Sequence, residues 1–215
     1  MSHPAFELME GDIRDLETCK QAMIGIDYVS HQAALGSVPR SINDPATTNA
    51  VNISGFLNMM IALKDSDSVK RMVYAASSST YGDSKNLPKV EDIIGNPLSP
   101  YAVTKYVNEL YASVFGTTYN TDVIGLRYFN VFGPKQSPNG AYAAVIPLFM
   151  QVLKDRKSPT INGDGTQTRD FTFVDNAVQA NVRGFFASET AKNQVFNVAC
   201  GERIDLNYLW DSLKT

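Results

Sequence analysis

The sequence has few of the residues that cross-link a chain or bind a metal. Its 215 residues include two cysteines, Cys19 and Cys200, and two histidines, His3 and His31. Two distant cysteines give no disulfide framework, and two histidines without a CxxC pair give no metal site. We therefore expect a cytoplasmic protein, in a reducing compartment, that works without a bound metal.

Long hydrophobic runs and a strong charge of one sign are also lacking. No apolar run reaches the roughly 20 residues that a membrane span needs, and the first residues do not resemble a signal peptide. The net charge is −3, from 19 basic and 22 acidic residues, without a basic stripe. These absences argue against a membrane partner and against nucleic acid. The 44% of hydrophobic residues is ordinary for a globular protein with a core.

A glycine-rich dinucleotide fingerprint is missing as well. The nearest candidate, Gly163-Asp-Gly165, is not followed by the third glycine and does not link a strand to a helix. Backbone amides of such a turn and helix supply much of the anion binding for a pyrophosphate. The given sequence therefore offers no strong pyrophosphate site of this type.

What the sequence does contain is an alternation of short strands and longer helices. We expect strands at 6–9, 27–31, 69–76, 122–126 and 195–198, and helices at 16–24, 44–63, 100–115, 141–153 and 174–187. This order is typical of βαβ units. The sequence therefore predicts an α/β fold with a parallel sheet.

A tyrosine and a lysine stand four residues apart, at Tyr101 and Lys105. On a helix, this spacing brings both side chains to one face. Ser99 suits an N-cap and Pro100 the first helical position, which places Tyr101 in the first turn. The ammonium and the helix dipole both favour a phenolate, so we expect a lowered pKa of Tyr101. A lone pair of this spacing also occurs on ordinary surface helices.

A run of hydroxyl groups ends the strand expected at 69–76. It reads Ser77-Ser-Ser-Thr-Tyr-Gly82. In an open α/β sheet, ligands bind at the carboxyl edge of the strands, and hydroxyl groups there suit a sugar or an alcohol. A serine-rich turn is common by itself. Because the Tyr101 segment follows at the distance of a helix and a loop, we interpret the two segments as one active site.

Together these motifs resemble the extended short-chain dehydrogenase/reductase family, and within it the bacterial UDP-N-acetylglucosamine 4-epimerases of surface-polysaccharide biosynthesis. The resemblance covers nearly the whole chain. Further segments that match in order are 11–15, 31–39, 126–134 and 162–171.

The resemblance implies a Rossmann-like, doubly wound parallel sheet without its first βαβ portion, followed by a small C-terminal substrate lobe. The NAD-binding part would comprise residues 1–133 and 172–199, and the substrate lobe residues 134–171 and 200–215. It also implies that the chain is shortened at both ends, and it allows a homodimer.

The resemblance further implies NAD as the cofactor. The residues that it assigns to NAD are Asp12, Ile13, Gln32, Ala33, Ala34, Gly36, Asn52, Tyr101, Lys105 and Tyr128. Asp12 would accept a hydrogen bond from the adenine amine, with Ile13 behind the ring. A core hydrogen bond explains Asn52 equally well, and small residues such as Ala33 also serve packing.

A UDP-sugar is the substrate that the resemblance implies. The residues that it assigns to this substrate are Gly36, Ser37, Val38, Ser77, Ser78, Ser79, Tyr101, Asn130, Gln136, Val145, Asn162 and Arg169. Arg169 would pair with the diphosphate, because a guanidinium matches phosphate oxygens. Without the resemblance, a surface ion pair with Asp170 would be the better interpretation of this arginine.

The reaction type follows from the serine cluster. Dehydratases of this family carry Thr-Asp-Glu at these positions, since loss of water needs an added acid and base, and decarboxylases carry a glutamate nearby. This chain has only hydroxyl groups there. The resemblance therefore implies 4-epimerisation, with Tyr101 as base, Ser77 as its hydroxyl partner, and Lys105 holding the nicotinamide ribose.

Two alternatives stay open. One is another sugar-nucleotide oxidoreductase, such as a keto-sugar reductase, which would consume its cofactor. The other is a fragment that binds nucleotide sugars without catalysis. Because the glycine-rich turn is missing, we expect the chain alone to have little or no epimerase activity.

Overall fold

A four-stranded parallel sheet forms the centre of the computed structural model, which describes residues 3–139 and 144–214. The strands run in the order β1 (Tyr28–His31), β2 (Arg71–Ser77), β3 (Val123–Tyr128) and β7 (Val195–Val198). Both central strands, β2 and β3, are almost entirely buried, as expected for a parallel sheet covered on both faces. The predicted α/β fold is confirmed.

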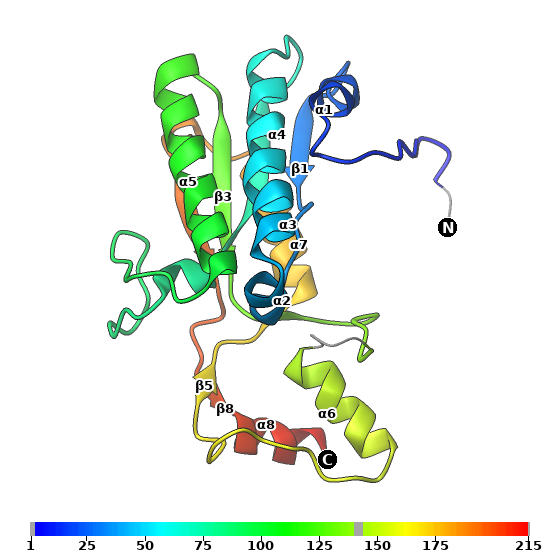
Figure 1. The fold of residues 1–215 in the computed structure, drawn as a ribbon, viewed down its shortest axis with the longest axis vertical. Helices are drawn as coiled ribbons and strands as arrows, with labels where there is room; N and C mark the ends of the chain where they lie inside the picture. The colour runs from blue at the N-terminus through cyan, green and yellow to red at the C-terminus, as the bar shows by residue number, and fades with distance from the viewer. Residues whose placement is uncertain (1–2, 140–143, 215) are drawn as a thin grey trace.

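Helices cover both faces of the sheet (Figure 1). On one face, α4 (Gly55–Lys64) and α5 (Pro100–Tyr119) pack on Met72, Tyr74 and Ala76 of β2. On the other face, α7 (Val174–Phe185) packs on Val73 and the neighbouring side chains of β3. Alternate residues of β2 therefore pack into two different cores, one on each face, as in a doubly wound sheet.

The helix expected at 44–63 is interrupted. It consists of α3 (Pro45–Asn49), a π-helical turn η1 (Ala50–Ser54) and α4, with α1 (Leu16–Ala22) packed beside α4. Another short helix, α2 (Val38–Asn43), precedes them and was not expected from the sequence. π-helical turns are rare and often occur at functional sites.

A smaller group of elements lies beyond the carboxyl edge of the sheet, at the bottom of Figure 1. It contains α6 (Val145–Lys154), α8 (Leu206–Leu213) and the antiparallel pair β5 (Thr168–Arg169) and β8 (Ile204–Asp205). The two helices share a separate apolar cluster. A second short pair, β4 (Val131–Phe132) with β6 (Thr172–Phe173), connects this group to the sheet. The turns η2 (Ser78–Tyr81) and η3 (Glu189–Ala191) complete the elements of the described residues.

The strand expected at 6–9 does not form. Its apolar side chains are exposed, 67% for Phe6 and 71% for Leu8. A strand needs a neighbour for its backbone hydrogen bonds, and in the described residues β1 pairs with β2 alone. The prediction of a strand at 6–9 is therefore wrong for this structure.

Candidate active site

The first turn of α5 lies at the carboxyl edge of the sheet, on the side that faces the smaller group of elements (Figure 1). Ser99 is the N-cap, and its hydroxyl accepts from the amide of Ala102 at 3.1 Å. Pro100 occupies the first helical position and Tyr101 follows, as predicted from the sequence. The strand β2 ends next to this turn, so Ser77 and Tyr101 come from adjacent elements.

Tyr101, Lys105 and Ser77 form one group of side chains. The Lys105 ammonium lies 6.0 Å from the centre of the Tyr101 ring, and Ser77 lies close enough to the Tyr101 hydroxyl to lower its pKa by hydrogen bonding. The Ser77 hydroxyl also accepts from the amide and the hydroxyl of Ser79, at 3.2 and 2.9 Å. Ser78 lies half-buried in the same turn. The two motifs that the sequence separates by more than twenty residues therefore do meet.

Burial controls the protonation of this group. It raises the pKa of Tyr101, and the hydrogen bond from Ser77 acts in the opposite direction. Burial also lowers the pKa of Lys105 to about 8. The prediction of a lowered pKa for Tyr101 is wrong for this structure, because the removal of the phenol from water outweighs the hydrogen bond from Ser77.

The donors around Lys105 fit the ribose of a dinucleotide. Its ammonium donates to the carbonyl of Ala75 at 2.7 Å and carries two further donor hydrogens. Its side chain is nevertheless buried. An added Cβ on the exposed Gly36 would meet no atom within 4 Å. Lys105 could therefore donate hydrogen bonds to a hydroxyl-rich ligand, and the backbone at Gly36 leaves open space at its own position.

Small and polar residues follow β1, where the NAD contacts are expected. Gln32 and Ala33 are exposed and Ala34 is half-buried. The amide nitrogen of Gln32 donates to the side-chain oxygen of Asn181 at 3.0 Å. These positions remain predicted cofactor contacts.

Asn52 makes the hydrogen bonds of a core residue. Its side chain accepts from the amide of Leu35 at 2.7 Å, and donates to the carbonyl of Leu35 and to the Thr104 hydroxyl, both at 3.1 Å. Only 1% of Asn52 is exposed. The structure therefore contains the core hydrogen bonds that the alternative interpretation of Asn52 predicts. A contact between Asn52 and NAD stays a prediction.

Asp12 and Ile13, the predicted adenine contacts, lie before α1. The Asp12 carboxylate binds the Arg14 guanidinium at 2.6 Å, and hydrogen bonds from Arg14 lower the pKa of Asp12 to about 2. The side chain of Ile13 packs against Gly55 of α4. Both assignments stay predictions.

The predicted substrate loop continues from Gly36 into α2. The hydroxyl of Ser37 caps this helix by accepting from the amide of Arg40 at 3.2 Å, and Val38 is exposed. The φ of Ser37 is 134°, in the region that normally favours glycine. Strained backbone of this kind is concentrated at functional sites.

Tyr128 and Asn130 point to different surroundings. Tyr128 faces α7, where its hydroxyl accepts from Asn181 at 2.7 Å, whereas Lys105 lies on the α5 face. Asn130 is exposed and donates to the carbonyl of Asp170 at 2.7 Å. Neither placement decides the predicted contacts with nicotinamide and sugar.

The remaining substrate candidates lie around the smaller group of elements. Gln136 has a buried side-chain oxygen with no partner among the described residues. Val145 begins α6 and Asn162 is exposed in a turn. Arg169 is also exposed and donates to the carbonyl of Thr168, while the Asp170 carboxylate accepts from the amides of residues 200 and 201. The alternative ion pair between Arg169 and Asp170 is therefore not present.

Several residues near the site were not predicted from the sequence. Ser41 accepts from the amide of Tyr101, Thr104 donates to the carbonyl of Tyr101, and Asn181 holds Tyr128. A buried pair, Arg127 and Glu109, lies behind the serine cluster. For Ser41, Asn181 and the pair of Arg127 and Glu109, no local pattern marks the residues, because their partners are distant in sequence.

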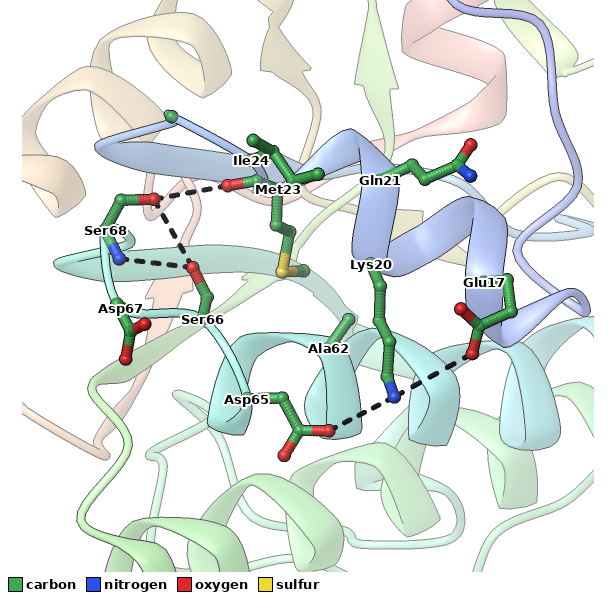
Figure 2. Close-up of a pocket in the computed structure, with 11 residues that line it drawn as sticks. Glu17, Lys20, Gln21, Met23, Ile24, Ala62, Asp65, Ser66, Asp67 and Ser68 are labelled. Carbon is green, nitrogen blue, oxygen red and sulfur yellow. Dashed lines mark hydrogen bonds and ion pairs between the residues drawn. The ribbon is translucent and has the colours of Figure 1, made fainter.

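A pocket of about 460 Å³ lies at the opposite edge of the sheet. Figure 2 shows Lys20 of α1 between Glu17 and Asp65, with N–O distances of 3.8 and 3.4 Å. Its lining contains none of the predicted site residues. The candidate active site therefore stays the edge with Tyr101, and this pocket is separate from it.

Neither a metal site nor a membrane span is found in residues 3–139 and 144–214. No group of three or more histidine, cysteine, aspartate or glutamate side chains there could hold an ion. No helix of the same residues has the length and apolar character needed to cross a membrane.

The buried side chain of His31 should make the stability of the folded protein depend on pH. Burial, and then the charge of Lys105, lower the pKa of His31 from 6.5 to about 4. Between these values the unfolded chain binds more protons, so the free energy of unfolding should rise by up to about 3 kcal/mol as pH rises from 4 to 6.5. Chemical denaturation across this window should show that rise, and His31→Gln should flatten it. An unchanged slope in the variant would assign the pH dependence to other groups.

The geometry is that of a Rossmann-like parallel α/β fold with a Ser–Tyr–Lys group at the carboxyl edge of its sheet. The description "NAD dependent epimerase/dehydratase family" belongs to a family model that matches residues 2–199. The chain belongs to this family. The expectations of an extended short-chain dehydrogenase/reductase and of NAD as cofactor are confirmed at the level of the family.

Three relatives show the range of sugars in this group. A putative UDP-glucose 4-epimerase of Methanocaldococcus jannaschii is 34% identical over 99% of this chain and 68% of its own length. The structure of a UDP-N-acetylglucosamine 4-epimerase from Methanobrevibacter ruminantium has a TM-score of 0.90 at 39% identity, over 96% of this chain and 66% of that one. A UDP-glucuronic acid 4-epimerase from Bacillus cereus, solved with UDP-glucuronic acid and NAD, has a TM-score of 0.84 at 29% identity, over 93% and 63%.

The chain spans about two thirds of the length of these three relatives. The three names give three different sugars. The comparisons thus establish the family of this chain, but they do not assign its activity or its sugar.

Proposed function

We propose that this chain is the catalytic part of an NAD-dependent UDP-hexose 4-epimerase. The observation that carries the proposal is the meeting of Ser77, Tyr101 and Lys105 at the carboxyl edge of the sheet. The phenol can exchange a proton with a sugar hydroxyl, and the serine can orient that hydroxyl. The ammonium of Lys105 would hold ribose hydroxyls and stabilise a phenolate.

In the proposed reaction, Tyr101 accepts the proton of the C4 hydroxyl. When bound, NAD would supply the reversible acceptance of hydride from C4. The resulting 4-keto sugar rotates within the site. Tyr101 returns the proton once C4 has been reduced from its other face. The raised pKa of Tyr101 favours that return of the proton. In the first step, the ammonium of Lys105, 6.0 Å from the ring centre, would stabilise the phenolate that accepts the proton.

The serine cluster supports epimerisation over elimination. Ser78 and Ser79 have no carboxyl group that could serve as the extra acid or base for loss of water. The second candidate is a keto-sugar reductase, which needs the same three residues. Cofactor balance separates the two: an epimerase regenerates NAD in each cycle, whereas a reductase oxidises one NADH for each product.

We propose UDP-N-acetylglucosamine and UDP-N-acetylgalactosamine as the substrate pair, within cytoplasmic polysaccharide biosynthesis. The support is the segment resemblance described above and the 39% identity to an enzyme of that name. The proposed division is an NAD-binding part at 1–133 and 172–199, with a substrate lobe at 134–171 and 200–215. The separate apolar cluster of α6 and α8 supports this lobe.

The test is conversion of UDP-N-acetylglucosamine with NAD, followed by NMR for the C4 epimer and by absorbance for NADH. It is run on the 215-residue chain and on a fusion that adds a glycine-rich strand–turn–helix ahead of Met1. The epimer without net NADH supports the proposal. Stoichiometric cofactor use supports the reductase, and binding without conversion in either protein supports the non-catalytic alternative.

We also propose a homodimer that uses α5. Val103, Leu110 and Val114 lie on one face of this helix and are 44%, 49% and 55% exposed. An apolar stripe on a helix is stabilised when a second surface covers it. Sedimentation of the wild type and of Leu110→Lys tests this: a monomeric wild type would contradict the proposal.

Arg169 provides a test of the nucleotide part of the substrate. Arg169→Ala should weaken UDP binding about tenfold, the lower end for a charge-assisted contact because the side chain is exposed. Calorimetric titration with UDP measures this. Arg203, which also contacts Thr168, offers a matched control, and Arg203→Ala should bind UDP like the wild type. Equal affinities of all three proteins would remove Arg169 from the proposed site.

A further inference from the structure

The backbone amides at the start of α5 differ in whether their hydrogen-bond partners are local or distant in sequence. Pro100 has no amide hydrogen, and the amides of Ala102 and Val103 are bonded to the side chain and the carbonyl of Ser99. These are local capping bonds. The amide of Tyr101, in contrast, donates to the hydroxyl of Ser41 at 3.0 Å, sixty residues away in sequence. The catalytic residue is therefore the one whose amide is held by another element.

Ser41 connects this turn to the predicted substrate loop. Its hydroxyl donates to the carbonyl of Val38 at 2.7 Å and accepts from Tyr101, so both of its functions are used. The residue is 0% exposed. The loop residue Ser37, just before Val38, has the strained φ of 134°. One buried hydroxyl thus joins a strained loop to the backbone of Tyr101.

A second connection holds the backbone carbonyl of Tyr101, which lies in the following peptide unit. The carbonyl of Tyr101 accepts from the Thr104 hydroxyl at 2.8 Å, and Thr104 accepts from Asn52 at 3.1 Å. Asn52 lies in the π-helical turn and binds both backbone groups of Leu35. The amide and the carbonyl of Tyr101 are therefore both tied to the segment 35–41. General capping of a helix would require neither connection.

We propose that Ser41 is a positioning residue that sets the place of Tyr101 relative to Ser77 and links it to the loop 36–38. The catalytic part of this inference rests on the proposed function, whereas the placement of Tyr101 does not. Small displacements of a reacting group lower turnover strongly. Without the Ser41 hydroxyl, the first turn of α5 should shift and the Tyr101–Ser77 hydrogen bond should weaken.

NMR of the hydroxyl-bearing ring carbon of Tyr101 tests the placement directly. The protein is labelled with ¹³C at this carbon in all tyrosines, and Tyr101→Phe assigns the signal. Ser77→Ala then defines the shift that follows loss of the hydrogen bond. Ser41→Ala should move the Tyr101 signal in the same direction by at least about half as much, because a weakened bond changes the electron density of the phenol.

Thr48→Val is the matched control. Thr48 is a buried hydroxyl residue of the neighbouring α3, and its side chain donates to the carbonyl of Asp44, without a bond to α5. This variant should leave the Tyr101 signal in place. Ser41→Cys, of similar volume but with a weak acceptor, replaces Ser41→Ala if that variant does not fold. An unmoved signal in folded variants overturns the proposal. Failure of both Ser41 variants to fold also overturns it, because the bond would then be a general structural one.

Turnover separates positioning from the proposed function. In the fusion, Ser41→Ala should lower kcat roughly tenfold or more, while KM for the UDP-sugar changes less than about threefold. Equal kcat values would overturn the catalytic part of the inference. A wild type without turnover would instead contradict the proposed function, and the NMR result would still decide the placement.

Discussion

Replacing Tyr101 with phenylalanine should lower epimerase turnover by roughly 10²–10⁴-fold, the usual contribution of a general acid–base group. The phenyl ring keeps the packing at the start of α5, and only the hydroxyl that is bonded to Ser77 is lost. Affinity for UDP should therefore stay close to that of the wild type. The rate of C4 inversion, measured by NMR with NAD present, gives the result.

Tyr106→Phe is the control for this substitution. Tyr106 lies on the same helix, also half-buried, and lines a pocket away from Ser77. Its variant should turn over substrate like the wild type. If Tyr101→Phe retained more than about a tenth of the wild-type rate, the proton transfer would belong to another group, and the assignment of the Ser–Tyr–Lys group would be wrong.

The sequence predicted those parts of the site that rest on local rules. The cap at Ser99, the proline at Pro100 and the four-residue spacing to Lys105 depend on helix geometry alone, and the structure has all of them. The parallel sheet also followed from the alternation of apolar segments. These features need no knowledge of distant contacts.

The remaining features depend on residues that are far apart in sequence. The pKa of Tyr101 is raised because the folded chain buries the phenol, which the motif alone cannot show. The segment 6–9 had the pattern of a strand but has no neighbour to pair with. Ser41 could be recognised only after the fold had brought it to α5, and so could the bond from Asn52 to Thr104.

The buried pair of Arg127 and Glu109 illustrates a further dependence on distant contacts. Two hydrogen bonds, of 2.9 and 2.7 Å, join the guanidinium of β3 to the carboxylate of α5. The same guanidinium donates to the Tyr81 hydroxyl at 3.0 Å and to the carbonyl of Glu91 at 2.9 Å. Both side chains are about 95% buried, with exposed fractions of 5% and 6%. The pair thus ties the turn after Ser77 to the sheet.

Glu109→Gln should destabilise the protein by about 3–5 kcal/mol, because it leaves the charge of Arg127 buried without a counter-charge. That loss is a large fraction of the roughly 5–15 kcal/mol by which a typical domain is stable. Urea denaturation of both proteins at the same pH measures it. Because Tyr81 ends the serine turn, the Ser77 hydroxyl should also be less well placed, and turnover should fall with stability.

Two further proteins make this prediction decisive. The double variant Arg127→Met with Glu109→Leu removes both charges together and should recover most of the lost stability. Asp27→Asn breaks the exposed ion pair with Lys70, whose side chains are 62% and 64% exposed, and should cost less than about 1 kcal/mol. If Glu109→Gln cost no more than Asp27→Asn, the buried carboxylate would not be needed to balance Arg127. The turn that carries Ser77 would then be held by its other bonds, among them the one from the Tyr81 hydroxyl to Asn197.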